Sequence, residues 1–142
     1  MEKFTHTTLV KQLWFSSNAL YRRLDLSLGT IHGIGFTEYM VLDALSEAPN
    51  GLLRRVDLAA AIGRTASGVT RLLAPMEKIG LIEKAQNNRD ARVSMVKLTE
   101  AGKRIWRDAT TSLQQNTKNM FYEADEKRLN DLLTFLQKTG GR

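Results

Sequence analysis

The sequence lacks cysteine altogether and contains only two histidines, His6 and His32, among its 142 residues. Without thiols the chain has no disulfide, no thiolate zinc site and no thiol redox sensor, and two histidines argue against a zinc-sensing cluster. No apolar run approaches the roughly 20 residues that a membrane-spanning helix needs. The first six residues lack the charged and then apolar plan of a signal peptide. We therefore expect a cytoplasmic protein without a metal or another cofactor.

Motifs typical of enzymes are also missing from the sequence. There is no Gly-rich phosphate loop, no nucleophile elbow and no pair of histidines at metal-binding spacing. Serine, threonine and carboxylate side chains are plentiful, but no motif groups them for acid–base chemistry. We therefore predict a binding protein rather than an enzyme.

Positive charge is concentrated in the middle of the chain. The net charge is +6, and residues 54–107 contain 12 Lys and Arg against 5 Asp and Glu, a local net charge of +7. The two flanks together carry −1. A polyanionic partner accounts for this distribution, because neutralisation of phosphates dominates nucleic-acid affinity. Judged by charge alone, a merely basic surface is an almost equally good interpretation.

Hydrophobic spacing and turn residues predict a mainly α-helical chain with one small β-hairpin. We expect Gly29, Gly33 and Gly35 to end the first helix, and Thr37, Thr65 and Thr99 to cap the second, fourth and fifth. The expected helices cover residues 8–28, 36–45, 56–62, 65–79, 99 to about 122, and 125 onward, and the expected strands cover residues 81–85 and 93–98. A helix, a hairpin and a second helix in this order predict a winged helix-turn-helix.

The helix expected over residues 65–79 has two different faces. Val69, Leu72, Leu73 and Met76 share one face at i, i+3, i+4 and i+7, which predicts burial. The opposite face consists of Ser67, Thr70, Arg71, Ala74 and Lys78. Such a face suits entry into a major groove, where arginine and hydroxyl groups contact base edges or phosphates. An ordinary solvated helix is the alternative, and Pro75 predicts a local kink just behind Arg71.

The expected hairpin has a basic tip that contains Arg89, Asp90 and Arg92. An aspartate two residues before an arginine can hold its guanidinium through a charge-assisted, bidentate hydrogen bond. A positioned arginine suits a narrow minor groove, where the negative potential is enhanced. A solvated turn is the alternative, because charged hairpin tips are common. The position of the tip between the amphipathic helix and the second strand favours the DNA-binding interpretation.

Four segments of the sequence resemble the MarR family of transcriptional regulators: Val-Thr-Arg-Leu-Leu at 69–73, Met-Glu-Lys-Ile-Gly-Leu-Ile at 76–82, Arg-Asp-Ala-Arg at 89–92 and Lys-Leu-Thr-Glu-Ala-Gly at 97–102. The resemblance is specific over residues 57–102. It implies one domain over residues 1–142, with a DNA-binding lobe at 36–99. It also implies a homodimer, which binds a pseudo-palindromic operator and usually represses.

Long amphipathic helices at both ends of the chain agree with a two-fold dimer. The resemblance assigns dimerisation to residues 5–28 and 100–139. The alternative is that these helices only close the core of a monomer.

The resemblance further implies a small aromatic or anionic effector that releases the DNA. The family's pocket between dimerisation helices and DNA-binding lobe would involve Trp14, His32, Phe36, Tyr39 and also Trp106, since aromatic walls with few polar groups suit an aromatic acid. Core packing is the alternative for Trp14 and Phe36, and a solvated loop position is the alternative for His32.

We therefore predict a sequence-specific regulator that binds double-stranded DNA, acting as a repressor. The expected DNA contacts are Thr65, Ser67, Thr70, Arg71, Lys78, Arg89, Asp90 and Arg92. A winged-helix protein–protein adaptor is the alternative function. An adaptor would not need a basic recognition face, so Arg71, Arg89 and Arg92 argue against it.

Overall fold

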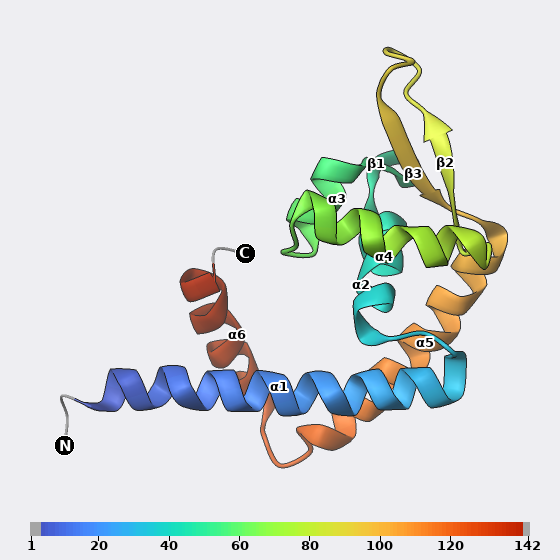
Figure 1. Ribbon diagram of the computed structural model, residues 1–142. Coiled ribbons are helices and arrows are strands. Elements are labelled where there is room, and N and C mark those ends of the chain that lie inside the picture. Colours follow the sequence, from blue (N-terminus) through green and yellow to red (C-terminus); the bar gives the residue numbers. More distant parts are fainter. Residues whose placement is uncertain (1–3, 141–142) are drawn as a thin grey trace. The chain divides into compact units, whose positions relative to one another are not determined.

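The computed structural model describes residues 4–140 and is mainly helical with one small antiparallel sheet, as predicted (Figure 1). The chain divides into two compact units, Met1–Thr110 and Thr111–Arg142. The elements are α1 (Thr5–His32), α2 (Phe36–Glu47), the 3₁₀ turn η2 (Pro49–Gly51), β1 (Leu52–Arg54), α3 (Arg55–Ala61), α4 (Ala66–Lys78), β2 (Ile82–Gln86), β3 (Ser94–Leu98), α5 (Glu100–Met120) and α6 (Glu126–Gly140).

Helix α1 is longer than the sequence pattern predicts, by three residues at its start and four at its end. Gly29 lies inside the helix, which ends at His32. Gly33 then adopts a left-handed conformation with φ 72°, and its N–H donates to the Gly29 carbonyl at 3.1 Å. The prediction that the helix stops at residue 28 was wrong, because a glycine is tolerated in a last helical turn whereas a left-handed residue ends it.

The sequence predicted that Thr37 caps α2, but a residue of the neighbouring helix α1 caps it instead. Gly35 is the cap residue, so Thr37 is the second residue of the helix. The Asp25 carboxylate on α1 accepts the Phe36 N–H at 2.8 Å, and the Glu38 carboxylate accepts the Gly35 N–H at 3.4 Å. A Cβ atom at Gly35 would lie 2.7 Å from the Asp25 carboxylate, so the approach of α1 needs glycine there.

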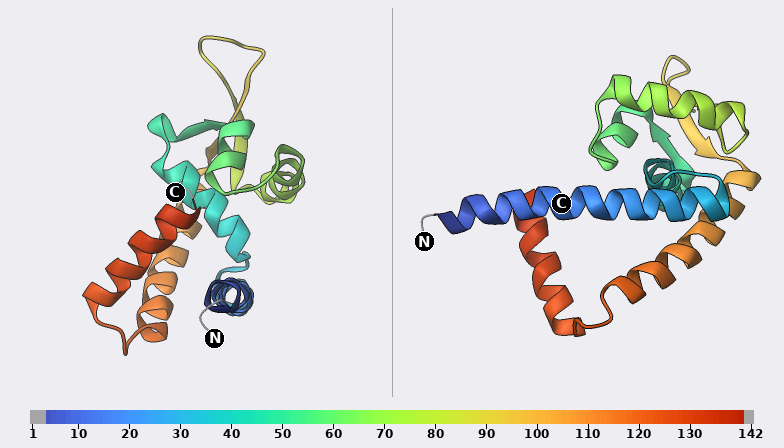
Figure 2. Two further views of the ribbon diagram at one scale, coloured as in Figure 1. Left: turned by 90° about the vertical axis from the view of Figure 1, so that its left-hand side faces the viewer. Right: turned by 60° about the horizontal axis from the view of Figure 1, so that its bottom comes forward.

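The sheet has three strands in the order β1-β3-β2, and both pairings are antiparallel. The sequence predicted β2 and β3 but not β1, whose three residues are too few to show alternation. In the central strand Lys97 pairs with Leu52 on one side and with Glu83 on the other. The β2–β3 hairpin projects away from the helices, as Figure 2 shows from two further directions.

The core of the Met1–Thr110 unit joins α1, α2, α3, α4 and the sheet. Side chains less than 2% exposed form it: Leu28, Val41, Leu42, Leu45, Leu58, Val69, Leu73, Met76 and Val96. Burial of an aliphatic side chain contributes about 1.5–3 kcal/mol, so these contacts hold the hairpin and α4 in a defined relation. We call residues 36–99 the winged-helix lobe.

Two threonines cap the helices on either side of the hairpin, as predicted. The Thr65 hydroxyl accepts the Gly68 N–H at 3.1 Å at the start of α4. The Thr99 hydroxyl accepts the Gly102 N–H at 3.0 Å at the start of α5. Helix α4 continues through Pro75 to Lys78.

The second unit contains the rest of α5 and α6. Asp125 begins α6, because its carboxylate accepts the Arg128 N–H at 2.7 Å. The predicted apolar stripe of α6 is exposed in the single chain at Leu129, Leu132, Leu133 and Leu136. Over residues 4–140, none of the helices combines the length and apolarity that crossing a membrane requires.

Candidate nucleic-acid interface

The two faces of α4 divide as the sequence predicts. Val69, Leu73 and Met76 are buried at 0–1% exposure, and Leu72 is half-buried. The opposite face is exposed at Ser67, Thr70, Arg71, Ala74 and Lys78. The buried face fixes α4 against the sheet and α3, so the polar face is presented by a rigid support.

The first turns of α4 carry hydroxyl groups that already have local partners. The Thr65 and Ser67 hydroxyl oxygens lie 3.4 Å apart, and the Thr70 hydroxyl donates to the Ala66 carbonyl at 3.1 Å. A hydroxyl that donates internally still has lone pairs that accept a hydrogen bond from a ligand. Lys78 lies in the last turn, about 20 Å from Thr65 at 1.5 Å per residue.

The wing tip, residues 87–93, is ordered by side-chain to backbone hydrogen bonds. The Asn87 side-chain oxygen accepts the Arg89 N–H at 2.8 Å, and Asp90 Oδ1 accepts the Arg92 N–H at 3.0 Å. Both are turns that asparagine and aspartate stabilise locally. The wing tip, for which the sequence predicts no regular structure, is therefore a defined turn.

Asp90 also holds the Arg92 side chain in the predicted bidentate manner. Arg92 Nε lies 3.2 Å from Asp90 Oδ1, and Arg92 Nη2 lies 3.3 Å from Oδ2. The Arg92 side chain lowers the pKa of the Asp90 carboxyl below its ordinary value, and the Arg92 backbone N–H adds to this effect. The Arg92 side chain is still 91% exposed, so it is oriented without being covered.

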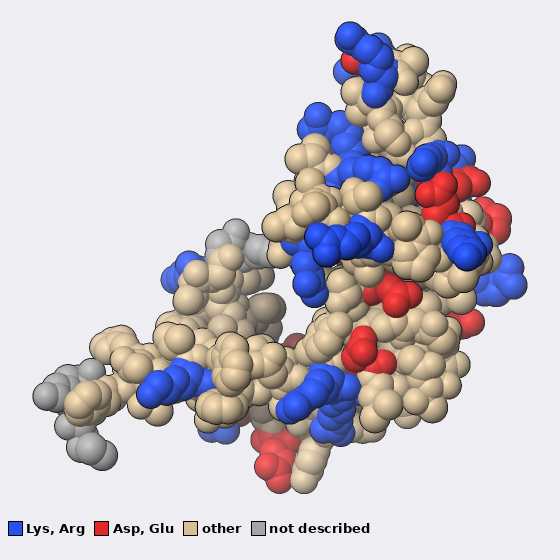
Figure 3. Space-filling model, in the orientation of Figure 1, with Lys and Arg blue, Asp and Glu red and all other residues tan. Residues whose placement is uncertain are grey.

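Basic side chains gather on the winged-helix lobe from the wing tip down across α4 (Figure 3). Arg71 and Lys78 lie on α4, and Arg89 and Arg92 lie at the wing tip. This face therefore combines an exposed helix with a separate projecting arginine, which is the geometry for contacts in two grooves of a duplex.

A second arginine–aspartate pair, Arg54 and Asp57, lies at the start of α3 and was not predicted from the sequence. Arg54 Nε is 2.8 Å from Asp57 Oδ2, and Arg54 Nη2 is 3.1 Å from Oδ1. This hydrogen-bonded pair lowers the pKa of Asp57 and raises that of Arg54. In the sequence, only the separation of three residues between Arg54 and Asp57 could have indicated this pair.

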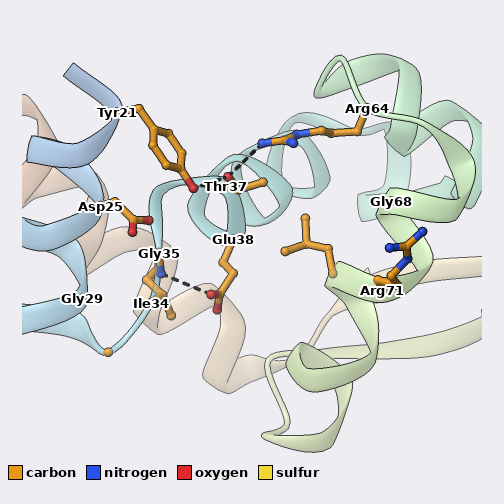
Figure 4. A pocket seen from close by; sticks show the side chains of 12 residues that line it. Tyr21, Asp25, Gly29, Ile34, Gly35, Thr37, Glu38, Arg64, Gly68 and Arg71 are labelled. Atoms are coloured by element: carbon orange, nitrogen blue, oxygen red, sulfur yellow. Dashed lines mark hydrogen bonds between the residues drawn. The ribbon is translucent and has the colours of Figure 1, made fainter. Parts of the chain in front are cut away.

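A pocket of about 710 Å³ lies between α1, α2 and the first turns of α4 (Figure 4). The Tyr21 hydroxyl is 3.2 Å from the Thr37 hydroxyl, which in turn accepts from Arg64 Nη2 at 3.4 Å. Arg64 and Arg71 line the pocket from the α4 side, and Asp25 and Glu38 line it from the other side. The pocket therefore offers an aromatic ring and two guanidinium groups to a ligand.

The residues expected to contact the effector, Trp14, His32, Phe36, Tyr39 and Trp106, lie outside the lining of this pocket. Trp14 is 62% exposed and meets Phe15 edge to face at 4.9 Å. Phe36 stacks on the buried Tyr39 with 6.2 Å between ring centroids. His32 is half-buried in the last turn of α1.

The residues that do line the pocket come from three elements that are distant in sequence, so no sequence pattern identified them. The structure also brings Trp106 to α2, where its indole N–H donates to the Asp43 carboxylate at 2.9 Å. Within residues 4–140, no group of three or more His, Cys, Asp or Glu is arranged to hold a metal ion.

Comparison with known proteins agrees with this geometry. Residues 32–93 match the model that describes the MarR family. The transcriptional repressor MprA of Escherichia coli (strain K12) is 32% identical over 76 residues, which are 54% of this chain and 43% of that protein. The match thus spans less than half the length of this curated relative.

Solved structures match almost the whole chain. The transcriptional regulator BldR from Sulfolobus solfataricus has a TM-score of 0.89 at 20% identity, covering 100% of this chain and 99% of that one. A mutant MarR from E. coli, complexed with operator DNA, has a TM-score of 0.82 at 21% identity, covering 96% of each chain. AbsC from Streptomyces coelicolor has a TM-score of 0.86 at 22% identity, covering 96% of this chain and 93% of that one. These likenesses establish the fold.

Proposed function

We propose that the protein is a sequence-specific transcriptional regulator of the MarR family, whose model matches residues 32–93, and that it binds double-stranded DNA. The observation that carries the proposal is the common face of the lobe, on which the exposed side of α4 and the Asp90–Arg92 pair lie together. The operator DNA bound by the similar MarR structure supports the same function.

In this proposal α4 is the recognition helix. Thr65, Ser67, Thr70 and Arg71 contact bases or phosphates in the major groove, because the first turns of such helices meet base edges. Lys78, at the far end of the helix, contacts the phosphate backbone, where a flexible ammonium group needs no fixed geometry.

The wing tip contacts the neighbouring minor groove. Arg92 enters this groove, and Asp90 orients Arg92 without contacting the bases. Arg89 contacts an adjacent phosphate. The hydrogen bonds within the wing tip support this assignment, because an ordered arginine loses less conformational entropy on binding than a free one.

We further propose that the protein is a homodimer, with the lobe at residues 36–99 and dimerisation helices at 5–28 and 100–139. The first half of α1 exposes large apolar side chains, including Leu9, Val10, Trp14 and Phe15, and α6 exposes its leucine stripe. Exposed apolar faces of this size in one chain favour an interface with a second copy. Two recognition helices then meet successive major grooves about 34 Å apart.

The pocket beside α4 supports the proposal of a small aromatic or anionic effector that releases the DNA. A carboxylate bound by Arg64 and Arg71 would withdraw Arg71 from the major groove, which would make a repressor lose its operator. The relatives named above are transcriptional regulators, so we assign the chain no catalytic step, no cofactor and a place in the cytoplasm.

Selection of bound sites from random duplex DNA tests this function. The expected result is a pseudo-palindromic motif with half-sites about one helical turn apart, bound by a dimer. Recovery of no motif, with equal and weak binding of every duplex, would instead support the adaptor function.

A further inference from the structure

A hydrogen-bonded group joins α2 to the first half of α5. The Trp106 indole N–H donates to Asp43 Oδ1 at 2.9 Å, and the Tyr39 hydroxyl donates to the same oxygen at 3.5 Å. The Tyr39 hydroxyl also lies 2.9 Å from the Thr110 hydroxyl. All four residues belong to the Met1–Thr110 unit.

The spacing of these residues makes the group a two-rung ladder. Tyr39 and Asp43 are four residues apart on α2, and Trp106 and Thr110 are four residues apart on α5. Residues four apart lie on the same face of a helix, so two consecutive turns of α2 hold two consecutive turns of α5.

Burial makes this contact stronger than a surface hydrogen bond. Tyr39 is 5% exposed, and the other three side chains are half-buried. A hydrogen bond to an ionised carboxylate is roughly twice as strong as one between neutral groups. Asp43 is therefore the acceptor on which the group depends.

A separate contact holds the beginning of α5. The Thr99 hydroxyl donates to the Gly80 carbonyl at 2.5 Å, and the Thr99 N–H donates to the Leu81 carbonyl at 3.1 Å. Gly102 packs against the same Leu81 carbonyl so closely that a Cβ atom would overlap it. Helix α5 is thus held at its first turn and again near Trp106 and Thr110.

A helix that is held at two points has a defined direction, whereas a helix held at one point can pivot about it. From Gly102 to Thr110 the two holds are about 12 Å apart at 1.5 Å per residue. If only the contacts at Gly102 remained, a pivot of about 16° would move Thr110 by about 3.4 Å, the rise of one base pair.

We infer that Asp43 is a positioning residue for operator recognition, because it sets the direction of α5 and with it the separation of the two recognition helices. This inference rests on the proposed dimeric DNA-binding function. Asp43 does not touch DNA in this arrangement. Its loss leaves each recognition helix able to bind a half-site but relaxes the distance at which two half-sites are read together.

The test compares operators whose half-sites are moved apart or together by one base pair. We expect the wild-type protein to lose about tenfold or more in affinity on either change, similar to a mismatched base pair. For Asp43→Ala we expect this ratio to fall to about threefold or less. Asp43→Asn, which keeps an acceptor oxygen for the Trp106 N–H, should retain most of the wild-type ratio.

Two further variants separate this role from a general loss of stability. Trp106→Phe keeps an aromatic ring but removes the donor, so it should reproduce the flattened spacing preference even if Asp43→Ala does not fold. Glu47→Ala removes an exposed carboxylate from the end of the same helix and should behave like the wild type.

Each outcome has a definite meaning. One outcome is a sharp spacing optimum in the wild type that the folded variants Asp43→Ala and Trp106→Phe both retain. That result would overturn this inference and leave the proposed function intact. A wild type that binds no duplex would overturn the proposed function, and the inference with it. A lower melting temperature with unchanged spacing preference would show that the ladder serves stability alone.

Discussion

The Asp90 carboxylate accepts three hydrogen bonds from Arg92, one from the backbone N–H at 3.0 Å and two from the guanidinium group at 3.2 and 3.3 Å. The guanidinium is thereby held in one orientation while its side chain stays 91% exposed. A pair so exposed contributes little to folding stability. Its geometry is therefore best explained by a partner that meets the wing tip, and this relationship leads to the first two predictions.

Replacement of Arg92 by alanine should weaken operator binding without changing the fold. The loss of one specific contact per subunit corresponds to a decrease of about 5- to 100-fold in affinity. Fluorescence anisotropy at physiological salt measures this decrease, and circular dichroism checks the fold. Glu47→Ala, which removes an exposed side chain outside the proposed DNA contacts and dimerisation helices, is the control. Equal affinities for Arg92→Ala and the wild type would exclude the wing tip from recognition.

Acid should release Arg92 from Asp90 only below the ordinary titration range of aspartate. Because the folded pKa of Asp90 lies below 3.8, the contact is fully present above that pH and is lost as the pH falls through the lowered value. The NMR shifts of Arg92 Nε–H should stay constant from about pH 8 to 5. In Asp90→Asn they should lack the acid transition; a wild-type transition near neutral pH would contradict this assignment.

Operator affinity should depend steeply on salt. A dimer that places about six to ten basic groups on phosphates gives a slope of roughly −5 to −9 in a plot of log K against log salt. Replacement of Lys78 by alanine should make the slope less negative by about one to two units in the dimer. A flat plot would favour the protein–protein adaptor.

Arg64 should be needed for the response to an anionic effector. A titration of aromatic carboxylates against the protein–operator complex identifies a compound that releases the DNA. Arg64→Gln should then need about tenfold or more of that compound, because loss of a charged partner removes a charge-assisted hydrogen bond. Glu47→Gln is the control, since Glu47 is exposed and does not line the pocket. An unchanged response in Arg64→Gln would place the effector elsewhere.

Two glycine-to-alanine changes should have opposite effects on stability. Gly102→Ala should lower the free energy of unfolding by about 1–3 kcal/mol, because its Cβ overlaps the Leu81 carbonyl. Gly29→Ala should raise it by about 0.5–1 kcal/mol, since the nearest atom to a Cβ there is 3.9 Å away and alanine favours a helix. Chemical denaturation measures both changes, and equal effects would contradict this account of the close approach at Gly102.

The sequence alone determined the features that depend on residues close together in the chain. Thr65 and Thr99 cap their helices because a hydroxyl three residues before an amide can accept its hydrogen bond. The buried face of α4 followed from apolar residues at helical spacing, and the Asp90–Arg92 pair followed from a separation of two residues in a turn. These interactions depend on neighbours that the chain order itself supplies.

Only the tertiary structure decided what depends on residues that are distant in sequence. Asp25 caps α2 from another helix, so Thr37 was wrongly expected as the cap. The pocket joins Tyr21 to Arg64 through Thr37, and Asp43 meets Trp106 across 63 positions. Periodicity describes which face of an element is apolar, but not which other element covers it, because that choice is made by packing of the whole core.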